Sequence, residues 1–252
     1  MLFNNPINYA NIFSGFVSIV VSFIILFKNR KEILNILFFS SLFCWGISLL
    51  LNGFNFLYLH PVLGAKIIRD FVTSAGSIAS FLIFTTALSI YVGGYLLKKY
   101  YVIVPIIIIM IINTVIASYF DYVKYDSPND TDIGNGIKTT QEAWVMIFLY
   151  VIPVIMICLA IFFFIKTRSM VKEDIIKKRT LFFIFCFVSI IIGVLIYGMG
   201  GIIEQVMTDY PMVYEYVIWI LAEIFWTIAP ILLLVGFFIG RVKENNYSKN
   251  IG

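Results

Sequence analysis

Seven long, almost uncharged runs of apolar residues constrain this chain more than any other feature. They lie at about 10–27, 33–57, 71–97, 102–120, 144–165, 181–203 and 217–240. Each is close to the roughly 20 residues that a helix needs to cross a bilayer. A membrane β-barrel would show short strands of alternating hydrophobicity, and the run Ile106–Ile112 does not alternate. Because a helix satisfies its own backbone hydrogen bonds, we predict an all-α fold, a single seven-transmembrane-helix bundle over residues 1–252.

The composition excludes a water-soluble fold. Hydrophobic residues make up 61% of the chain and charged residues 13%, with a mean hydropathy of +0.98. A soluble domain carries about 45–50% apolar and about 25% charged residues. Intrinsic disorder is excluded as well, because it requires low hydrophobicity and a high net charge, and the net charge here is +4. We therefore expect the lipid bilayer as the surroundings of this protein, and no nucleic-acid partner.

The distribution of charge predicts the orientation in the membrane. Of the 18 Lys and Arg residues, all but four follow the first, third, fifth or seventh run, and the four are Lys66, Arg69, Lys124 and Lys138. Cytoplasmic loops are enriched in Lys and Arg, so we predict an external N-terminus and a cytoplasmic C-terminus in a multi-pass protein of the cell membrane. The leader 1–11 carries no positive charge, so we do not expect a cleaved signal peptide.

Glu223 is the one acid that lies well inside an apolar run. A charged side chain at the centre of a membrane helix costs about 3 kcal/mol on insertion scales, and such residues usually face the bundle interior and mark function. Trp219 and Trp226 stand four and three residues away from it, which places all three on one helix face. We therefore expect this face to look into the bundle.

Other polar and aromatic side chains occupy the same level, the outer half of the predicted bundle. The complete set of candidate ligand-binding residues is Glu223, Trp219, Trp226, Tyr197, Glu204, Asn52, Asn55, Arg69 and Asp70. If their helix faces converge, they form an outward-facing pocket in which Arg69 pairs with a carboxylate. The alternative is a polar plug, in which Glu223 is protonated or hydrogen-bonded by Tyr197 or an asparagine. The residues alone leave both interpretations open.

The chain lacks the residues that several chemistries need. Retinal requires a Schiff-base lysine in the last helix, and residues 217–240 contain no lysine. A zinc centre takes several His or Cys ligands, whereas His60 is the only histidine and the three cysteines, Cys44, Cys158 and Cys186, show no metal-ligand spacing. No hydrolase or nucleotide-binding motif occurs. We therefore expect no cofactor, no metal and no enzymatic activity.

The connection Asp121–Ala143 is predicted to be external and contains several aspartates. Its spacing does not fit a calcium-binding EF-hand loop, because Gln141 stands where the final bidentate Glu is needed. We predict a solvated, turn-rich loop.

The connection Lys166–Thr180 is the largest segment predicted on the cytoplasmic side, and it is strongly basic. In this segment two acidic residues are each followed four residues later by a lysine, which favours helical extension beyond the membrane. The two predicted pairs are Glu173–Lys177 and Asp174–Lys178. This segment either lies against anionic head groups or docks a separate cytoplasmic signalling protein.

Two stretches carry a resemblance to a known family. Phe38–Gly94 has a mid-helix tryptophan, Trp45, a polar outer helix end at Asn52, and a long helix that ends in Tyr-Val-Gly-Gly-Tyr. Lys177–Arg241 has a basic entry, a glycine-rich outer half, an acidic loop and a last helix that closes at Gly-Arg. Together they resemble the seven-helix amino-terminal sensor region of archaeal and bacterial membrane histidine kinases. The resemblance implies a prokaryotic stimulus receptor. In that family the last helix leads into an output module, so signalling here is expected to use a separate protein.

These observations favour a stand-alone, receptor-like sensor that binds a small molecule from outside, with a homodimer left open. The alternative is a transporter or channel for a small solute or ion, with Glu223 as its coupling or selectivity carboxylate. Such a function would suit a three-plus-one-plus-three helix arrangement of the sugar-transporter type, built from parallel repeats. The last helix is purely apolar after Pro230, which favours a blind outer cavity over a continuous aqueous path.

Overall fold

The structure is a computed structural model of the whole chain, and it describes residues 6–57, 62–125, 137–141, 144, 145, 147–206 and 212–239. The long helices are α1 (Pro6–Lys28), α2 (Ile33–Leu57), α3 (Val62–Val92), α4 (Tyr100–Tyr119), α5 (Ile152–Met170), α6 (Asp174–Val206) and α7 (Met212–Phe238). A 3-10 helix, η1 (Gly94–Lys98), precedes α4, and a π-helical turn, η2 (Ile147–Val151), precedes α5. Among the described residues, seven helices are long and apolar enough to cross a membrane, as predicted.

Two helices extend well beyond the runs that predicted them. Helix α3 begins at Val62 instead of near residue 71, so Lys66, Arg69 and Asp70 lie on its first turns and not in a link. Helix α6 begins at Asp174, seven residues before the apolar run starts. An apolar run ends at its first charge, whereas Lys, Arg and Glu are good helix formers, so the backbone continues through them.

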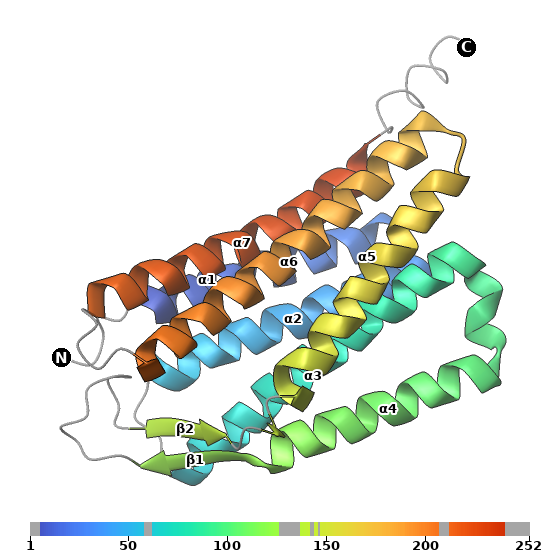
Figure 1. Cartoon of the computed structure of the whole chain (residues 1–252). Coiled ribbons are helices and arrows are strands. Elements are labelled where there is room, and N and C mark those ends of the chain that lie inside the picture. Colours follow the sequence, from blue (N-terminus) through green and yellow to red (C-terminus); the bar gives the residue numbers. More distant parts are fainter. Residues whose placement is uncertain are drawn as a thin grey trace.

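Six of the long helices close a ring in the order α1, α2, α3, α5, α6, α7, and α7 packs against α1 to complete it (Figure 1). Helix α4 brings the chain back to the end of the bundle at which α1 begins, so α5 begins at that end too. The triplets α1–α3 and α5–α7 therefore follow one another around the ring in the same direction. This order is compatible with a three-plus-one-plus-three arrangement. Below, "hairpin end" denotes the end of the bundle that carries the two β-strands, and "opposite end" the one that carries the α5–α6 connection.

Helix α4 lies outside the ring, against α3 (Figure 1). Only 11% of the apolar stretch of α4 is buried within the protein, compared with 44% of that of α3. Polar contacts attach it: Asn113 Nδ2 donates to Ser77 Oγ at 2.7 Å, and the hydroxyls of Ser74 and Ser118 share a hydrogen bond of 2.9 Å. Helices in lipid associate through small residues and interhelical hydrogen bonds, because apolar contact alone offers little advantage over lipid tails. One polar strip therefore secures a helix whose other faces are apolar.

Small residues bring α1 close to both of its neighbours. A Cβ at Gly15 would lie 2.7 Å from the carbonyl oxygen of Gly46 in α2, which is closer than real Cβ contacts, so only glycine allows this crossing. Helix α1 also carries the buried serines Ser14, Ser18 and Ser22. The Ser14 hydroxyl shares a hydrogen bond of 2.7 Å with that of Thr227 in α7. The serine stripe thus packs against α7, while the glycine face packs against α2.

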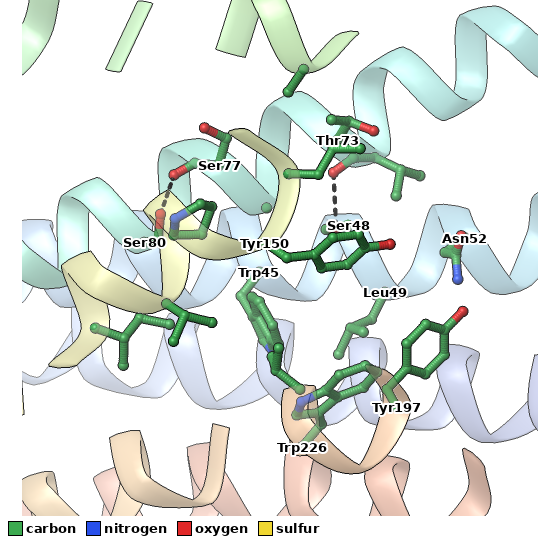
Figure 2. A pocket seen from close by; sticks show the side chains of 18 of the residues that line it. Trp45, Ser48, Leu49, Asn52, Thr73, Ser77, Ser80, Tyr150, Tyr197 and Trp226 are labelled. Atoms are coloured by element: carbon green, nitrogen blue, oxygen red, sulfur yellow. Dashed lines mark hydrogen bonds between the residues drawn. The ribbon is translucent and has the colours of Figure 1, made fainter. Parts of the chain in front are cut away.

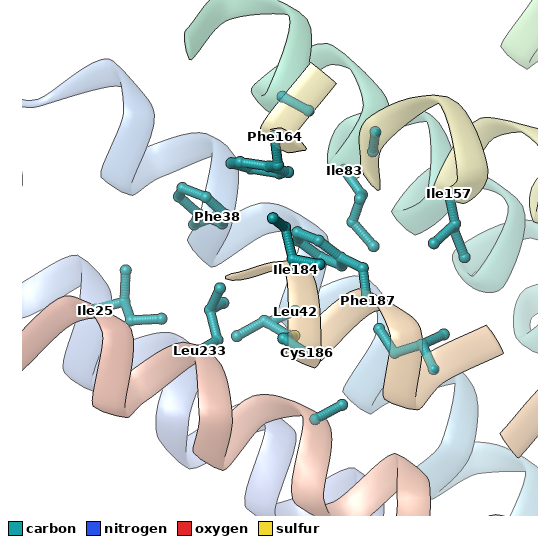
Figure 3. Packing of buried hydrophobic residues seen from close by; sticks show 14 of the residues in the cluster. Ile25, Phe38, Leu42, Ile83, Ile157, Phe164, Ile184, Cys186, Phe187 and Leu233 are labelled. Atoms are coloured by element: carbon teal, nitrogen blue, oxygen red, sulfur yellow. The ribbon is translucent and has the colours of Figure 1, made fainter. Parts of the chain in front are cut away.

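The hydrophobic core fills the opposite half of the ring (Figure 3). The ring of Phe38 lies 5.2 Å from those of Phe183 and Phe237, and Phe164 stacks on Phe187 at 5.5 Å. Such offset and edge contacts are the favourable geometries for aromatic pairs. All six ring helices contribute buried side chains, namely Ile25, Phe38, Leu42, Ile83, Ile157, Phe164, Cys186, Phe187 and Leu233. Aromatic side chains therefore pack tightly across the middle of this half.

The segment between α4 and α5 contains a β-hairpin where the sequence predicts only turns. Strands β1 (Asp121–Tyr125) and β2 (Ile137–Gln141) pair antiparallel, with Asp121 opposite Gln141. Their sequences, Asp-Tyr-Val-Lys-Tyr and Ile-Lys-Thr-Thr-Gln, are rich in aromatic and β-branched residues, which favour strands. The prediction of turns follows the aspartates of the connection 126–136, which lies outside the described residues.

The connection between α5 and α6 is short, because α5 ends at Met170 and α6 begins at Asp174. Both helices extend past their apolar runs, as predicted, but the ion pair differs. The predicted pairs were Glu173–Lys177 and Asp174–Lys178. In the structure Asp174 pairs with Lys177 instead: Lys177 Nζ lies 4.0 Å from Asp174 Oδ1, three residues earlier in the chain. The backbone N–H of Lys177 donates to the carbonyl of Glu173 at 3.0 Å, which forms the first turn of α6.

Candidate functional site

A cavity of about 160 Å³ lies inside the ring, in its hairpin half (Figure 2). Residues between 45 and 52 of α2, 69 and 80 of α3, and 148 and 157 at the start of α5 form most of its wall; α6 adds Val194 and Tyr197, and α7 adds Trp226. An engineered apolar cavity of about 150 Å³ admits benzene. The space therefore suffices for a small organic molecule or a few waters.

Arg69 and Asn52 form one polar part of the wall, near the hairpin end, and the hydroxyl residues Ser48, Thr73, Ser77 and Ser80 form another. Arg69 Nη1 donates to Asn52 Oδ1 at 3.3 Å, which ties α3 to α2. Among the described residues that line the cavity, Arg69 is the one with a formal charge, and the lining includes no carboxylate. Arg69 thus places the one charged group of the described wall beside the Asn52 amide.

An aromatic cluster forms another part of the wall. Trp45 of α2 meets Trp226 of α7 edge to face at 5.8 Å between ring centroids. Tyr197 of α6 lies 5.6 Å from Trp226 and stacks on Trp219 at 5.8 Å. The aromatic stripes that the sequence places on the sixth and seventh helices thus meet each other, and Trp45 extends them to the second helix (Figure 2).

Helix α5 reaches the cavity through the π-helical turn η2, which contributes Phe148, Leu149 and Tyr150. Pro153 follows directly and has no N–H to donate to the carbonyl of Leu149, four residues earlier. The missing hydrogen bond provides a physical reason for the wider turn. Figure 2 shows Tyr150 projecting into the cavity. Single π-turns within α-helices occur frequently at functional sites.

Two buried atoms on the cavity wall have no hydrogen-bond partner among the described residues: Asn11 Oδ1 and Trp45 Nε1. The amide nitrogen of Asn11 is used, since it donates to the carbonyl of Ile7 at 3.3 Å. Buried polar groups in folded proteins are almost always paired with protein or with ordered water. Both atoms are nevertheless covered from water-sized contact, so they are desolvated polar groups of residues that border the cavity.

Glu223 lies outside the cavity wall, at the contact of α7 with α1. Its side chain is 2% exposed, and neither carboxyl oxygen forms a hydrogen bond with a described residue. The Ser14 hydroxyl donates instead to the backbone carbonyl of Glu223, at 3.3 Å. Trp219 is also absent from the wall, and its Nε1 is buried without a hydrogen-bond partner among the described residues. Neither residue therefore lines the cavity, although Trp219 belongs to the aromatic cluster through its contact with Tyr197.

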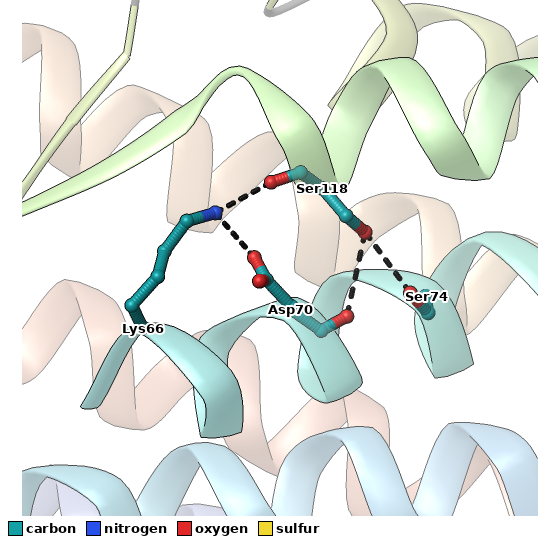
Figure 4. A network of polar contacts seen from close by, with 4 residues as sticks. All are labelled: Lys66, Asp70, Ser74 and Ser118. Carbon is teal, nitrogen blue, oxygen red and sulfur yellow. Dashed lines mark hydrogen bonds and ion pairs between the residues drawn. The ribbon is translucent and has the colours of Figure 1, made fainter. Parts of the chain in front are cut away.

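Asp70 faces away from the cavity, toward α4 (Figure 4). Its Oδ1 accepts a hydrogen bond from Lys66 Nζ, which also donates to the backbone carbonyl of Ser118 in the last turn of α4. A cation at the C-terminal end of a helix is favourable, because the helix dipole is negative there. Lys66 and Asp70 thus form a structural contact between α3 and α4, and Asp70 does not pair with Arg69.

The predicted candidate residues therefore fall into three groups. Those that line the cavity are Asn52, Arg69, Tyr197 and Trp226. Those beside it are Glu223, Trp219 and Asp70. Asn55, near the end of α2, and Glu204, near the end of α6, have side chains outside the described part of the structure.

Several lining residues were not predicted as site residues, above all Asn11, Trp45 and Tyr150. A signal existed for each. Asn11 continues the serine stripe of the first helix by one turn, Trp45 is the only tryptophan of the second run, and Tyr150 stands three residues before Pro153.

Within the described residues, no three His, Cys, Asp or Glu side chains gather as metal ligands. The described wall offers one guanidinium, two amides, several hydroxyls and five aromatic residues, a set suited to binding an organic molecule. No protein-family model matches the sequence, and no curated protein does either.

Proposed function

We propose that this protein is a membrane-embedded receptor or sensor, which binds a small molecule in the cavity of its hairpin half. The observation that carries the proposal is a cavity of about 160 Å³ whose described wall combines aromatic rings with amide and hydroxyl side chains and Arg69. A concave, largely apolar space with a few convergent polar groups is the usual form of a small-molecule site.

A blind cavity supports a receptor more than a conduit. Below the cavity, the ring is filled by the core side chains Phe38, Phe164 and Phe187, which are fully buried. Dense aromatic packing leaves little room for water. Glu223, the carboxylate that a transport mechanism would use, lies outside the cavity wall.

The proposed orientation places the hairpin end outside the cell. The opposite end carries most of the Lys and Arg residues, including the exposed Lys172 and Arg168, and such residues mark the cytoplasmic side. A ligand would therefore reach the cavity from the exterior.

The proposed output runs along α5 to the connection with α6, within Lys166–Thr180. Helix α5 starts at the cavity as a π-turn, which can change its register when a ligand contacts Tyr150. The end of α7 is held more firmly: Lys28 Nζ donates to the carbonyl of Phe237, and Arg179 Nε donates to that of Ile239 at 2.7 Å. Movement is therefore expected at the end of α5, where a separate cytoplasmic protein would dock.

Thermal unfolding of the purified protein during a small-molecule screen tests the proposal. Gly76 lines the cavity, and a Cβ there would meet only Ser48 Oγ, at 3.2 Å, so Gly76→Leu fills the space with little strain elsewhere. Gly198→Leu is the control, because Gly198 is exposed on α6 with open space around it. We expect compounds that stabilise the wild type and the control but not Gly76→Leu. Equal stabilisation of all three proteins, or no stabilising compound, would contradict a cavity receptor.

A transporter is the second candidate, because the ring unites two consecutive helix triplets around a cavity and leaves α4 outside. Parallel repeats of this kind place substrate sites at the repeat interface. Solute uptake into liposomes tests it. Uptake that the Glu223→Gln variant abolishes would replace the receptor proposal by this one.

A further inference from the structure

One face of α2 presents polar and aromatic side chains to the cavity in a row. Trp45, Ser48, Leu49 and Asn52 all line it, and their spacing of three and four residues places them on a single face of the helix. Ser48 and Asn52 are four residues apart, so they are neighbours, with about 5–6 Å between their Cβ atoms. Trp45 lies on the other side of Ser48, farther from the hairpin end. The row therefore changes from polar to aromatic with depth.

Ser48 offers the cavity a hydrogen-bond acceptor. A hydroxyl has one hydrogen to donate and two lone pairs, and Ser48 Oγ uses its hydrogen in a bond of 2.9 Å to the carbonyl of Val72 in α3. No described residue donates to this hydroxyl. The side chain is half-buried, and a Cβ added at Gly76, another residue of the wall, would lie 3.2 Å from its oxygen. A ligand N–H can therefore bond to Ser48 Oγ.

Asn52 offers a donor. Its amide oxygen accepts the bond from Arg69 Nη1, and because a guanidinium only donates, this bond fixes which atom of the amide is the oxygen. The nitrogen, Nδ2, is thus turned away from Arg69 and has no partner among the described residues. Figure 2 shows it on the side of Tyr197. A ligand carbonyl can therefore accept from Asn52 Nδ2.

We propose that the ligand is a small, uncharged aromatic compound that carries an acceptor and a donor side by side, as a primary carboxamide does. Its carbonyl oxygen accepts from Asn52 Nδ2, its N–H donates to Ser48 Oγ, and its ring lies deeper, against Trp45 and Trp226. This inference rests on the proposed function and specifies the chemical class that the same cavity takes.

The charges of the wall favour an uncharged ligand. The described lining includes no carboxylate that could balance a cation. Its one formal charge belongs to Arg69, which is engaged with protein groups, because it makes a further contact besides its bond to Asn52. An ion that leaves water without a charged partner loses much of its solvation energy. An amide instead replaces its bonds to water with bonds to Ser48 and Asn52.

The volume limits the ligand to one ring. A cavity of about 160 Å³ is close to the ~150 Å³ that admits benzene. A single ring with one short polar substituent fits this limit, whereas fused rings exceed it.

Three probes of nearly the same shape test the two hydrogen bonds. Benzamide has the acceptor and the donor, acetophenone has a methyl group in place of the amide nitrogen, and isopropylbenzene has neither polar group. Their affinities for the full chain in detergent are measured by tryptophan fluorescence and calorimetry. The ratio of affinities for two probes is compared between two proteins, so that partitioning of the probes into detergent cancels.

Ser48→Ala removes the acceptor. We expect it to lower the ratio of the benzamide affinity to the acetophenone affinity by about three- to tenfold, the contribution of one hydrogen bond. The ratio of acetophenone to isopropylbenzene should not change. Ser41→Ala is the matched control and should change neither ratio, because Ser41 also lies on α2 but is buried outside the wall, where it bonds to a carbonyl of its own helix.

Asn52→Asp removes the donor, because aspartate can accept the bond from Arg69 as asparagine does but has no N–H. We expect it to lower the ratio of acetophenone to isopropylbenzene by about three- to tenfold. Thermal unfolding verifies that each variant is folded. Benzoate and benzamidine, which carry opposite charges, test the wild type without any substitution, and each should bind at least about tenfold more weakly than benzamide.

The outcomes separate this inference from the proposed function. A probe ratio that stays unchanged in Ser48→Ala or in Asn52→Asp, or tighter binding of either ion than of benzamide, would overturn the assignment of an uncharged amide and leave a cavity receptor intact. Absence of binding by all five probes would also overturn the assignment, whereas the receptor proposal is decided by the comparison of Gly76→Leu with Gly198→Leu.

Discussion

The indole of Trp226 packs directly on the backbone of Gly193: a Cβ at Gly193 would lie 2.3 Å from Trp226 Nε1. This approach lets Trp226 Nε1 donate to the carbonyl of Ile190 at 3.3 Å. A glycine in α6 thus positions an aromatic ring of the cavity wall.

We predict that Gly193→Ala displaces Trp226 and lowers the stability of the protein. Overpacking of this kind costs about 1–3 kcal/mol, and loss of the bond to Ile190 adds to it. Thermal unfolding and tryptophan emission measure both effects. Gly198→Ala, on the same helix but in open space, is the matched control. An unchanged emission spectrum in Gly193→Ala would mean that the indole does not need this contact.

The carboxyl group of Glu223 is buried without a hydrogen-bond partner among the described residues, so replacing this residue with an apolar one should stabilise the protein. We expect Glu223→Leu to increase the unfolding free energy by on the order of 1 kcal/mol, because an unsatisfied buried polar group is removed. Asp70→Leu provides the contrast: this carboxylate is paired with Lys66, so its loss should destabilise. Denaturant titration in detergent compares the two. A destabilised Glu223→Leu would reveal a partner for this carboxyl group and revive a functional role at the α1–α7 contact.

The attachment of α4 depends on a few hydroxyl and amide groups, and Ser77 is central because it accepts hydrogen bonds from Asn113 and Thr114. We predict faster hydrogen exchange in α4 for Ser77→Ala, with a loss of about 0.6 kcal/mol per interhelical hydrogen bond. In Ser80→Ala the lost hydroxyl bonds to a carbonyl of its own helix, so exchange in α4 should not change. Equal exchange rates in both variants would show that apolar packing alone retains α4.

The proposed orientation predicts which positions a membrane-impermeant thiol reagent can reach. In a chain whose three cysteines are replaced by serine or alanine, a cysteine at Asn135 in the β1–β2 connection should react in intact cells. A cysteine at Arg168, near the end of α5, should react only after the cells are permeabilised. The reverse pattern would place the cavity on the cytoplasmic side.

The helices could be predicted because length and hydropathy specify a membrane span without reference to tertiary contacts. The start of α3 could not, because its first turns carry Lys66 and Arg69, which bond to Ser118 of α4 and Asn52 of α2, positions distant in the sequence. Likewise, the aspartates of the connection led to a prediction of turns throughout, although the residues on either side of it favour strands.

The site was predicted in part for a related reason. Periodicity identifies which residues share a face of one helix. It placed Trp219 and Trp226 on one face of the seventh helix and Tyr197 on a face of the sixth, and in the structure these two faces are in contact. It does not specify the rotation of that helix relative to its neighbours. Glu223 was prominent because it is the lone acid of its run, but membership in a cavity depends on helix crossing angles, which here turn it toward α1.

The contact between α1 and α7 also bears on how the chain assembles. Ser14 and Thr227, whose hydroxyls bond at 2.7 Å, are separated by 213 positions. The two helices can therefore meet only after the long helices between them have been synthesised. Until α7 is inserted, the Ser14 hydroxyl lacks this interhelical partner, so the ring closes late in the assembly of the described helices.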